Sequence, residues 1–212
     1  MTTGGDTGAL PIRVLADTSL IRHAITLRLE PDRMKGDQRL LGDAAAFWNL
    51  LNDPRVMMYY TSLLEHMLSR RFPAHWQGLK RRLTKASIPL SRADGYHKAD
   101  GSIKFGGTYG GGLRVLLSPE HEVALHAAAR NFQETGVETE YKKHRWKEFD
   151  YEHLEAALEI GARHFITTDY RLLRRLRSLT AEQKKNAVVQ RAASIAVRPV
   201  DALQALSATG RT

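Results

Sequence analysis

The stretch from Phe149 to Leu173 constrains the fold of this chain more than any other. Its first part has the apolar spacing of a helix that ends at Gly161, as helices commonly end at glycine. The next segment, His164 to Thr167, is too short for a helix and rich in residues that favour strands. One acid, Asp150, opens the helix, and another, Asp169, follows the strand. Ligands of open α/β sheets bind beyond the carboxyl ends of strands, so this stretch indicates an acidic ligand site.

The rest of the chain predicts alternating strands and helices. Apolar runs indicate strands over Ile12–Ala16, Val56–Thr61 and Ser194–Val197. Capping residues and helical spacing predict helices over Leu20–Leu29, Ala44–Leu51 (opened by Gly42 and Asp43), Leu63–Arg71, His75–Leu83, Pro119–Glu134, Asp169–Leu179, Ala181–Ala192 and Asp201–Leu206. This order predicts an α/β fold in which a mostly parallel sheet is wrapped by helices.

A glycine-rich region interrupts the pattern between Ala86 and Ser118. Its turn-forming residues and two apolar flanks predict an inserted hairpin or loop. We therefore expect a flexible leader over residues 1–11, a single domain over 12–206 with an insertion at about 72–147, and a tail over 207–212.

Composition limits the classes of function. With 42% hydrophobic and 26% charged residues, the chain resembles a soluble globular protein. It has no apolar run of membrane-spanning length and no secretory signal, so we expect a cytoplasmic location and no membrane partner. The absence of cysteine excludes disulfides, thiolate zinc sites and cysteine nucleophiles. The net charge of +9 favours nucleic acid as a partner over the alternatives, which are simple solubility or a basic proteome.

Four acids occupy equivalent places in the predicted layout: Asp17, Glu65, Asp150 and Asp169. In a parallel sheet all four can meet at the carboxyl edge, where their charges would repel one another unless a cation neutralised them. Oxygen ligands of this kind favour Mg²⁺ or Mn²⁺. Each acid could instead be an ordinary residue of a helix start, and Glu152 competes with Asp150 for its place.

The sequence resembles the PIN-domain family of metal-dependent ribonucleases, which includes VapC-like toxins. The matching segments are RVLADTSLI (Arg13–Ile21), YYTSLLEHML (Tyr59–Leu68), DYEHLEAALEIGARHFITTDYRLL (Asp150–Leu173) and SIAVRPVDAL (Ser194–Leu203). The resemblance implies an α/β/α sandwich and a Mg²⁺- or Mn²⁺-dependent endoribonuclease. It also implies that the four acids are catalytic metal ligands, and that a hydroxyl of Thr167 or Thr168 hydrogen-bonds a ligand carboxylate or a metal-bound water.

Residues beside the acids are the expected substrate contacts. We assign Ser19 and Thr168 to this role, together with the arginines that follow Asp169, which could hold RNA phosphates: Arg171, Arg174 and Arg175. The resemblance further implies a homodimer and a possible protein antitoxin. Three alternatives stay open: an RNA-processing or defence nuclease without an antitoxin, a DNA nuclease, and an RNA-binding module that has lost catalysis.

Overall fold

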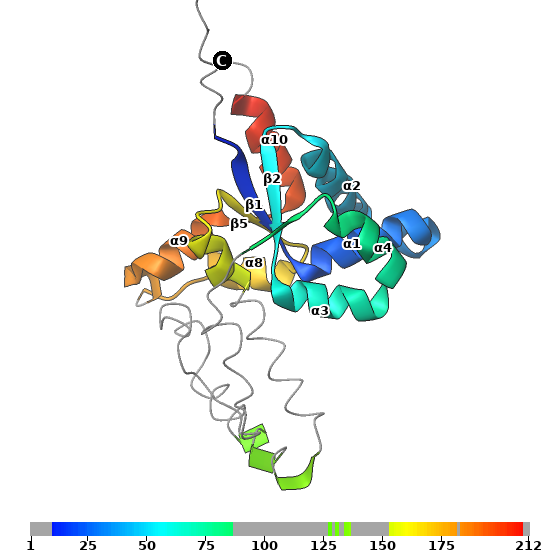
Figure 1. The fold of residues 1–212 in the computed structure, drawn as a ribbon. Coiled ribbons are helices and arrows are strands. Elements are labelled where there is room, and N and C mark those ends of the chain that lie inside the picture. Colours follow the sequence, from blue (N-terminus) through cyan, green and yellow to red (C-terminus); the bar gives the residue numbers. More distant parts are fainter. Residues whose placement is uncertain are drawn as a thin grey trace, which may run out of the picture.

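The sheet contains five parallel strands in the order β3-β2-β1-β4-β5 (Figure 1). This architecture comes from a computed structural model that describes residues 10–86, 127–128, 130–131, 134–136, 153–181 and 183–209. The strands are β1 (Ile12–Ala16), β2 (Val56–Tyr60), β3 (Thr84–Lys85), β4 (His164–Ile166) and β5 (Ala196–Val197). The central strand is β1, in which Leu15 pairs with Tyr59 of β2 and with Phe165 of β4.

Helices connect these strands. Between β1 and β3 lie α1 (Thr18–Leu29), the 3₁₀ turn η1 (Pro31–Met34), α2 (Gln38–Asn52), α3 (Ser62–Arg71) and α4 (Pro73–Lys80). A helix over residues 153–159 precedes β4. After β4 come α8 (Tyr170–Arg177), η3 (Gln183–Lys185), α9 (Ala187–Ile195) and α10 (Pro199–Thr209).

The alternation of side chains along β1 divides the core into two layers. Val14 and Ala16 belong to a cluster that also contains buried residues of α1, α2, α3, α4 and α10. Leu15 belongs to the opposite cluster, with buried residues of helix 153–159, α8 and α9. Helices therefore cover both faces of a parallel sheet, which confirms the predicted α/β class.

The helix over residues 153–159 ends as the sequence predicts. Gly161 has a φ of +63°, a left-handed conformation that glycine adopts without a steric cost. The amide of Gly161 donates to the carbonyl of Leu158, and the amide of Ala162 donates to that of Ala157. These two bonds form a Schellman motif, which turns the chain directly into β4.

Several boundaries differ from the sequence predictions. The second helix begins at Gln38, capped by Asp37, so Asp43 lies inside that helix instead of opening it. Ser194 lies in the last turn of α9, so the prediction that it begins the last strand was wrong. The two-residue strand β3 was not predicted, because Thr84 and Lys85 carry no apolar signal.

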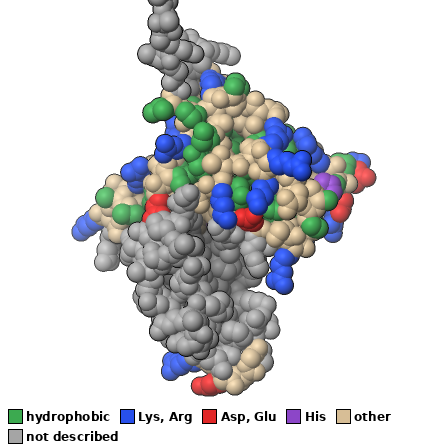
Figure 2. Space-filling model, viewed as in Figure 1, with side chains coloured by type: hydrophobic (Ala, Val, Ile, Leu, Met, Phe, Trp, Pro, Cys, Tyr) green, Lys and Arg blue, Asp and Glu red, His purple; other side chains and the backbone are tan. Residues whose placement is uncertain are grey.

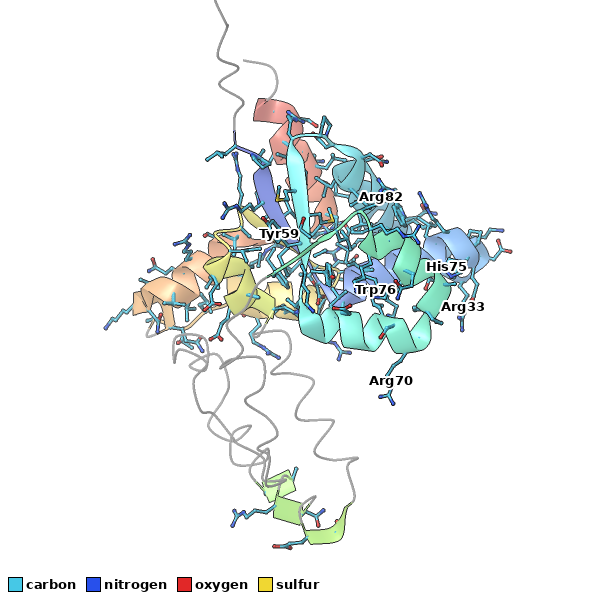
Figure 3. All side chains as sticks on the ribbon, viewed as in Figure 1. Arg33, Tyr59, Arg70, His75, Trp76 and Arg82 are labelled. Carbon is cyan, nitrogen blue, oxygen red and sulfur yellow. The ribbon has the colours of Figure 1, made fainter. Side chains whose placement is uncertain are left out.

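The body of the domain includes part of the expected insertion. Trp76, Leu79 and Leu83 belong to the core that covers one face of the sheet, and Figure 3 shows Trp76 pointing into the body from α4. The segment that starts at α4 and ends in β3 is therefore part of the sheet architecture. The expected glycine-rich hairpin and most of the helix predicted over Pro119–Glu134 lie outside the described residues. Within the described residues, none of the helices has the length and apolar character required to span a bilayer.

Candidate functional site

The connections leaving β1 and β4 diverge to opposite sides of the sheet. From β1 the chain runs through α1 and α2 to β2, whereas from β4 it runs through α8 and α9 to β5 (Figure 1). The carboxyl ends of these two neighbouring strands therefore form a topological switch point, where α/β proteins bind their ligands. Asp17 directly follows β1, and Asp169 lies three residues beyond the end of β4.

The hydroxyl of Thr167 joins these two acids. It donates a hydrogen bond of 2.7 Å to Oδ2 of Asp17 and accepts one of 2.9 Å from the amide of Asp169. Thr167 is fully buried, and Asp17 is only 3% exposed. The structure thus contains the expected bond between a threonine, Thr167, and a predicted ligand carboxylate, that of Asp17. The same hydroxyl brings Asp17 close to the backbone of Asp169.

Donors surround the carboxylate of Asp17. Its Oδ1 accepts a bond of 2.6 Å from the amide of Thr18, and its Oδ2 accepts a second hydroxyl bond, from Ser19. The amide of Asp17 also donates to the carbonyl of Ile166 at 3.0 Å, which ties it to the end of β4. Asp17 therefore caps α1, as the alternative interpretation expected. The same residue is also held in a fixed position at the switch point by its hydrogen bonds.

Asp169 likewise caps a helix. Its Oδ1 accepts bonds of 2.8 Å and 3.0 Å from the amides of Arg171 and Leu172 at the start of α8. These cap bonds use one carboxylate oxygen and leave Oδ2 outside the cap. The cap fixes the orientation of the side chain.

Glu65 lies in the first turn of α3, directly after β2, but it is engaged by two lysines. Lys80 contacts its Oε1, and Lys85 contacts its Oε2 at 3.0 Å. The hydrogen bond from Lys80 is the main reason that the pKa of Glu65 is below its usual value. Among the residues that the structure describes, no three Asp, Glu or His side chains gather closely enough to hold a metal ion.

The fourth acid, Asp150, lies outside the described residues, but the helix that follows it contributes His153 to the edge. His153 is 2% exposed, with Nε2 at 3.2 Å from the hydroxyl of Thr18 and Nδ1 at 2.9 Å from that of Thr61. Because Thr18 follows β1 and Thr61 follows β2, one imidazole links the ends of two strands to helix 153–159.

Protonation of His153 should weaken the fold. Burial lowers its pKa below the ordinary value of 6.5, so the unfolded chain binds this proton more readily than the folded one. The free energy of unfolding should therefore fall as the pH drops below 6.5 towards the folded-state pKa. Thermal unfolding at about pH 7.5 and about pH 5.5 should show a smaller pH effect in His153→Gln than in the wild type. An equal pH effect in both proteins would contradict this role of His153.

A second histidine reaches the site from α1. Nδ1 of His23 lies 2.9 Å from the hydroxyl of Thr168, which donates at 3.1 Å to that of Ser19. The two expected substrate contacts, Ser19 and Thr168, are therefore hydrogen-bonded to each other beside Asp17. Burial, followed by the nearby charge of Arg22, lowers the pKa of His23 and favours its neutral form.

The helix α8, which Asp169 caps, carries the arginines that are expected to contact the substrate. Arg171 and Arg174 are exposed, and Arg175 is half-buried, while Leu172, Leu173 and Leu176 of the same helix are buried. The backbone amide of Arg171 donates to the carboxylate of Asp169, so the backbone of this arginine lies next to the site.

Asp17 and Asp169 are the two carboxylates at this edge that a small hard cation could use. Mg²⁺ is commonly bound through one or two carboxylates and keeps several waters. Both acids are carboxylates held in fixed orientation by hydrogen bonds, and Oδ2 of Asp169 lies outside the helix cap. The fit is weakest for Glu65, whose two oxygens face lysines.

Comparisons with protein families, curated proteins and solved structures found no match to this chain.

Sequence reasoning did not identify four residues of this edge: His23, Lys80, Lys85 and His153. A signal for His153 exists, because a histidine among apolar residues such as Leu154 and Ala157 must find hydrogen-bond partners inside the core. The lysines carry no comparable signal, since they lie 15 and 20 positions from Glu65 and reach it only through the fold.

Proposed function

We propose that this protein is a Mg²⁺- or Mn²⁺-dependent endoribonuclease of PIN-like fold, with its site at the carboxyl ends of β1 and β4. The observation that carries the proposal is the single hydroxyl of Thr167, which donates to the carboxylate of Asp17 and accepts from the backbone amide of Asp169 at the topological switch point. The resemblance of these segments to PIN-domain ribonucleases and the net charge of +9 support the same function.

In this proposal the acids bind the cation and neighbouring hydroxyls orient them. A divalent cation bound by Asp17 and Asp169 would supply activation of water and neutralise the charge that develops on the phosphate. Thr167 and Ser19 fix the orientation of Asp17 through their hydroxyls, so that the carboxylate needs little reorganisation. Asp150 and Glu65 are the further ligands that the sequence predicts, and Glu65 contacts Lys80 and Lys85 in the structure.

The arginines of α8 would hold the substrate. Arg171 and Arg174 are exposed on the helix that starts at Asp169, so their guanidinium groups can bind phosphates that flank the scissile bond. Phosphate contacts fix the position of the RNA strand relative to the site but do not recognise its bases. Any selection of a base sequence would therefore come from other residues.

The direct test is cleavage of a single-stranded RNA by the purified full chain. We expect cleavage with Mg²⁺ and with Mn²⁺, none with EDTA, and recovery when Mg²⁺ is added back in excess. Cleavage that persists in EDTA, or no cleavage with either metal, would contradict the proposal. A parallel assay on DNA of the same sequence separates ribonuclease from deoxyribonuclease activity.

A further inference from the structure

Basic residues dominate the part of the chain that forms α3, α4 and β3. Residues 61–86 contain six Lys and Arg residues and one acid, Glu65. We call the six the basic face: Arg70, Arg71, Lys80, Arg81, Arg82 and Lys85. Figure 2 shows Lys and Arg side chains on the side of the molecule formed by these elements, and Figure 3 shows Arg70 projecting away from α3.

The helices that carry the basic face pack against the hydrophobic core. Buried side chains of α3 and α4 belong to the core beneath it, among them Leu64, Leu68 and Trp76. The charged groups therefore point outward from elements that are anchored to the sheet. A rigid array of cations is better suited to binding a polyanion than a flexible charged tail, because less conformational freedom is lost on binding.

The single acid of this region organises two of the cations. Glu65 engages Lys80 with one carboxylate oxygen and Lys85 with the other, at 3.0 Å for Lys85. The side chains of Lys80 and Lys85 stay 36% and 53% exposed, against 24% for Glu65. Two ammonium groups share one negative charge, so the cluster keeps an excess positive charge that solvent can reach.

Contacts connect this lysine pair to the candidate site. Lys85 ends β3 and pairs in register with Tyr60 at the end of β2. The next residue, Thr61, bonds His153, which bonds Thr18 beside Asp17. The lysines thus lie at the same edge as the acids, two strand spacings from β1, or about 10 Å. A nucleic-acid strand of a few nucleotides covers this distance.

We propose that Lys80 and Lys85, held side by side by Glu65, bind a backbone phosphate of the RNA strand, and that the basic face guides this strand to the carboxyl edge. The substrate class rests on the proposed ribonuclease function. In this arrangement Glu65 positions the two lysines, one with each carboxylate oxygen.

The test is RNA binding in EDTA, which requires no cleavage. Fluorescence anisotropy with a labelled single-stranded RNA should be measured over a range of salt concentrations for wild type, Lys80→Ala, Lys85→Ala and the double variant. Lys35→Ala is the matched control, because Lys35 is an exposed lysine paired with one carboxylate, that of Asp32.

Each single substitution should weaken binding at low salt by about threefold or more and reduce the slope of log K against log salt by about 0.7. The double variant should bind no more tightly than either single variant, and Lys35→Ala should match the wild type. An unchanged affinity and salt slope in the double variant would overturn the proposal. Because the binding assay contains no metal, its result does not depend on cleavage. A loss of binding in the lysine variants would support this proposal even if the protein cleaved no RNA, and cleavage with unchanged binding would contradict only this proposal.

Discussion

Replacing Asp17 with Asn should lower the rate of Mg²⁺-dependent RNA cleavage by about a hundredfold to a thousandfold. The substitution keeps the shape of the side chain and removes the charge that a cation requires. The fold should tolerate it, since the new amide oxygen can accept from the amide of Thr18, and its NH₂ group can donate to the hydroxyls of Ser19 and Thr167, which can rotate.

The measurement is a single-turnover cleavage rate at saturating Mg²⁺, together with a thermal unfolding curve. Asp32→Asn provides the control, because Asp32 forms an exposed ion pair with Lys35 on η1, beyond the opposite end of the helix α1 that starts at Asp17. We expect Asp32→Asn to cleave at the wild-type rate. A variant at Asp17 that cleaves at the wild-type rate would remove this residue from the site.

Replacing Asp43 with Ala should produce the largest loss of stability, about 2–3 kcal/mol. Asp43 is fully buried in α2, where its Oδ2 accepts from the hydroxyl of Tyr170 at 2.9 Å and from Nε of Arg198 at 3.1 Å. One carboxylate thus ties α2 to the start of α8 and to the residue before α10. Its removal leaves the hydroxyl of the half-buried Tyr170 and a largely buried guanidinium without their acceptor.

Thermal unfolding should show this loss as a decrease in Tm of about 5–10 °C. Asp43→Asn should fall between the wild type and Asp43→Ala, because an amide oxygen still accepts hydrogen bonds but lacks the charge that Arg198 pairs with. Asp32→Ala, which breaks a surface ion pair, should change stability by less than about 1 kcal/mol. A melting temperature of Asp43→Ala within about a degree of the wild type would refute this account of α2 and α8.

The sequence was informative where local chemistry decides the structure. Strands β1, β2 and β4 are short apolar runs, and Gly161 ends its helix in the left-handed conformation that the pattern predicted. Asp17 and Asp169 were located for the same reason, since an acid next to a buried strand and before a helix marks the edge of a sheet.

Contacts between distant residues were beyond sequence reasoning. Asp43 was placed at a helix start, whereas the structure buries it against Tyr170 and Arg198, more than 100 residues away. The ligand role of Glu65 stays a prediction, and the lysines that engage it were not foreseen, since they come from α4 and from β3, a strand without an apolar pattern. Such pairings depend on how the elements pack, which no local spacing encodes.

The Mn²⁺ dependence of RNA cleavage in Asp169→Asn tests the central claim most directly. Asn is as good a helix cap as Asp, so the substitution should preserve α8 while removing the carboxylate charge. Asp37→Asn makes the same change at the cap of α2 and serves as the control. We predict that the Mn²⁺ concentration for half-maximal cleavage rises about tenfold or more in Asp169→Asn and stays unchanged in Asp37→Asn. Superimposable Mn²⁺ curves for Asp169→Asn and the wild type would contradict a metal site at this edge.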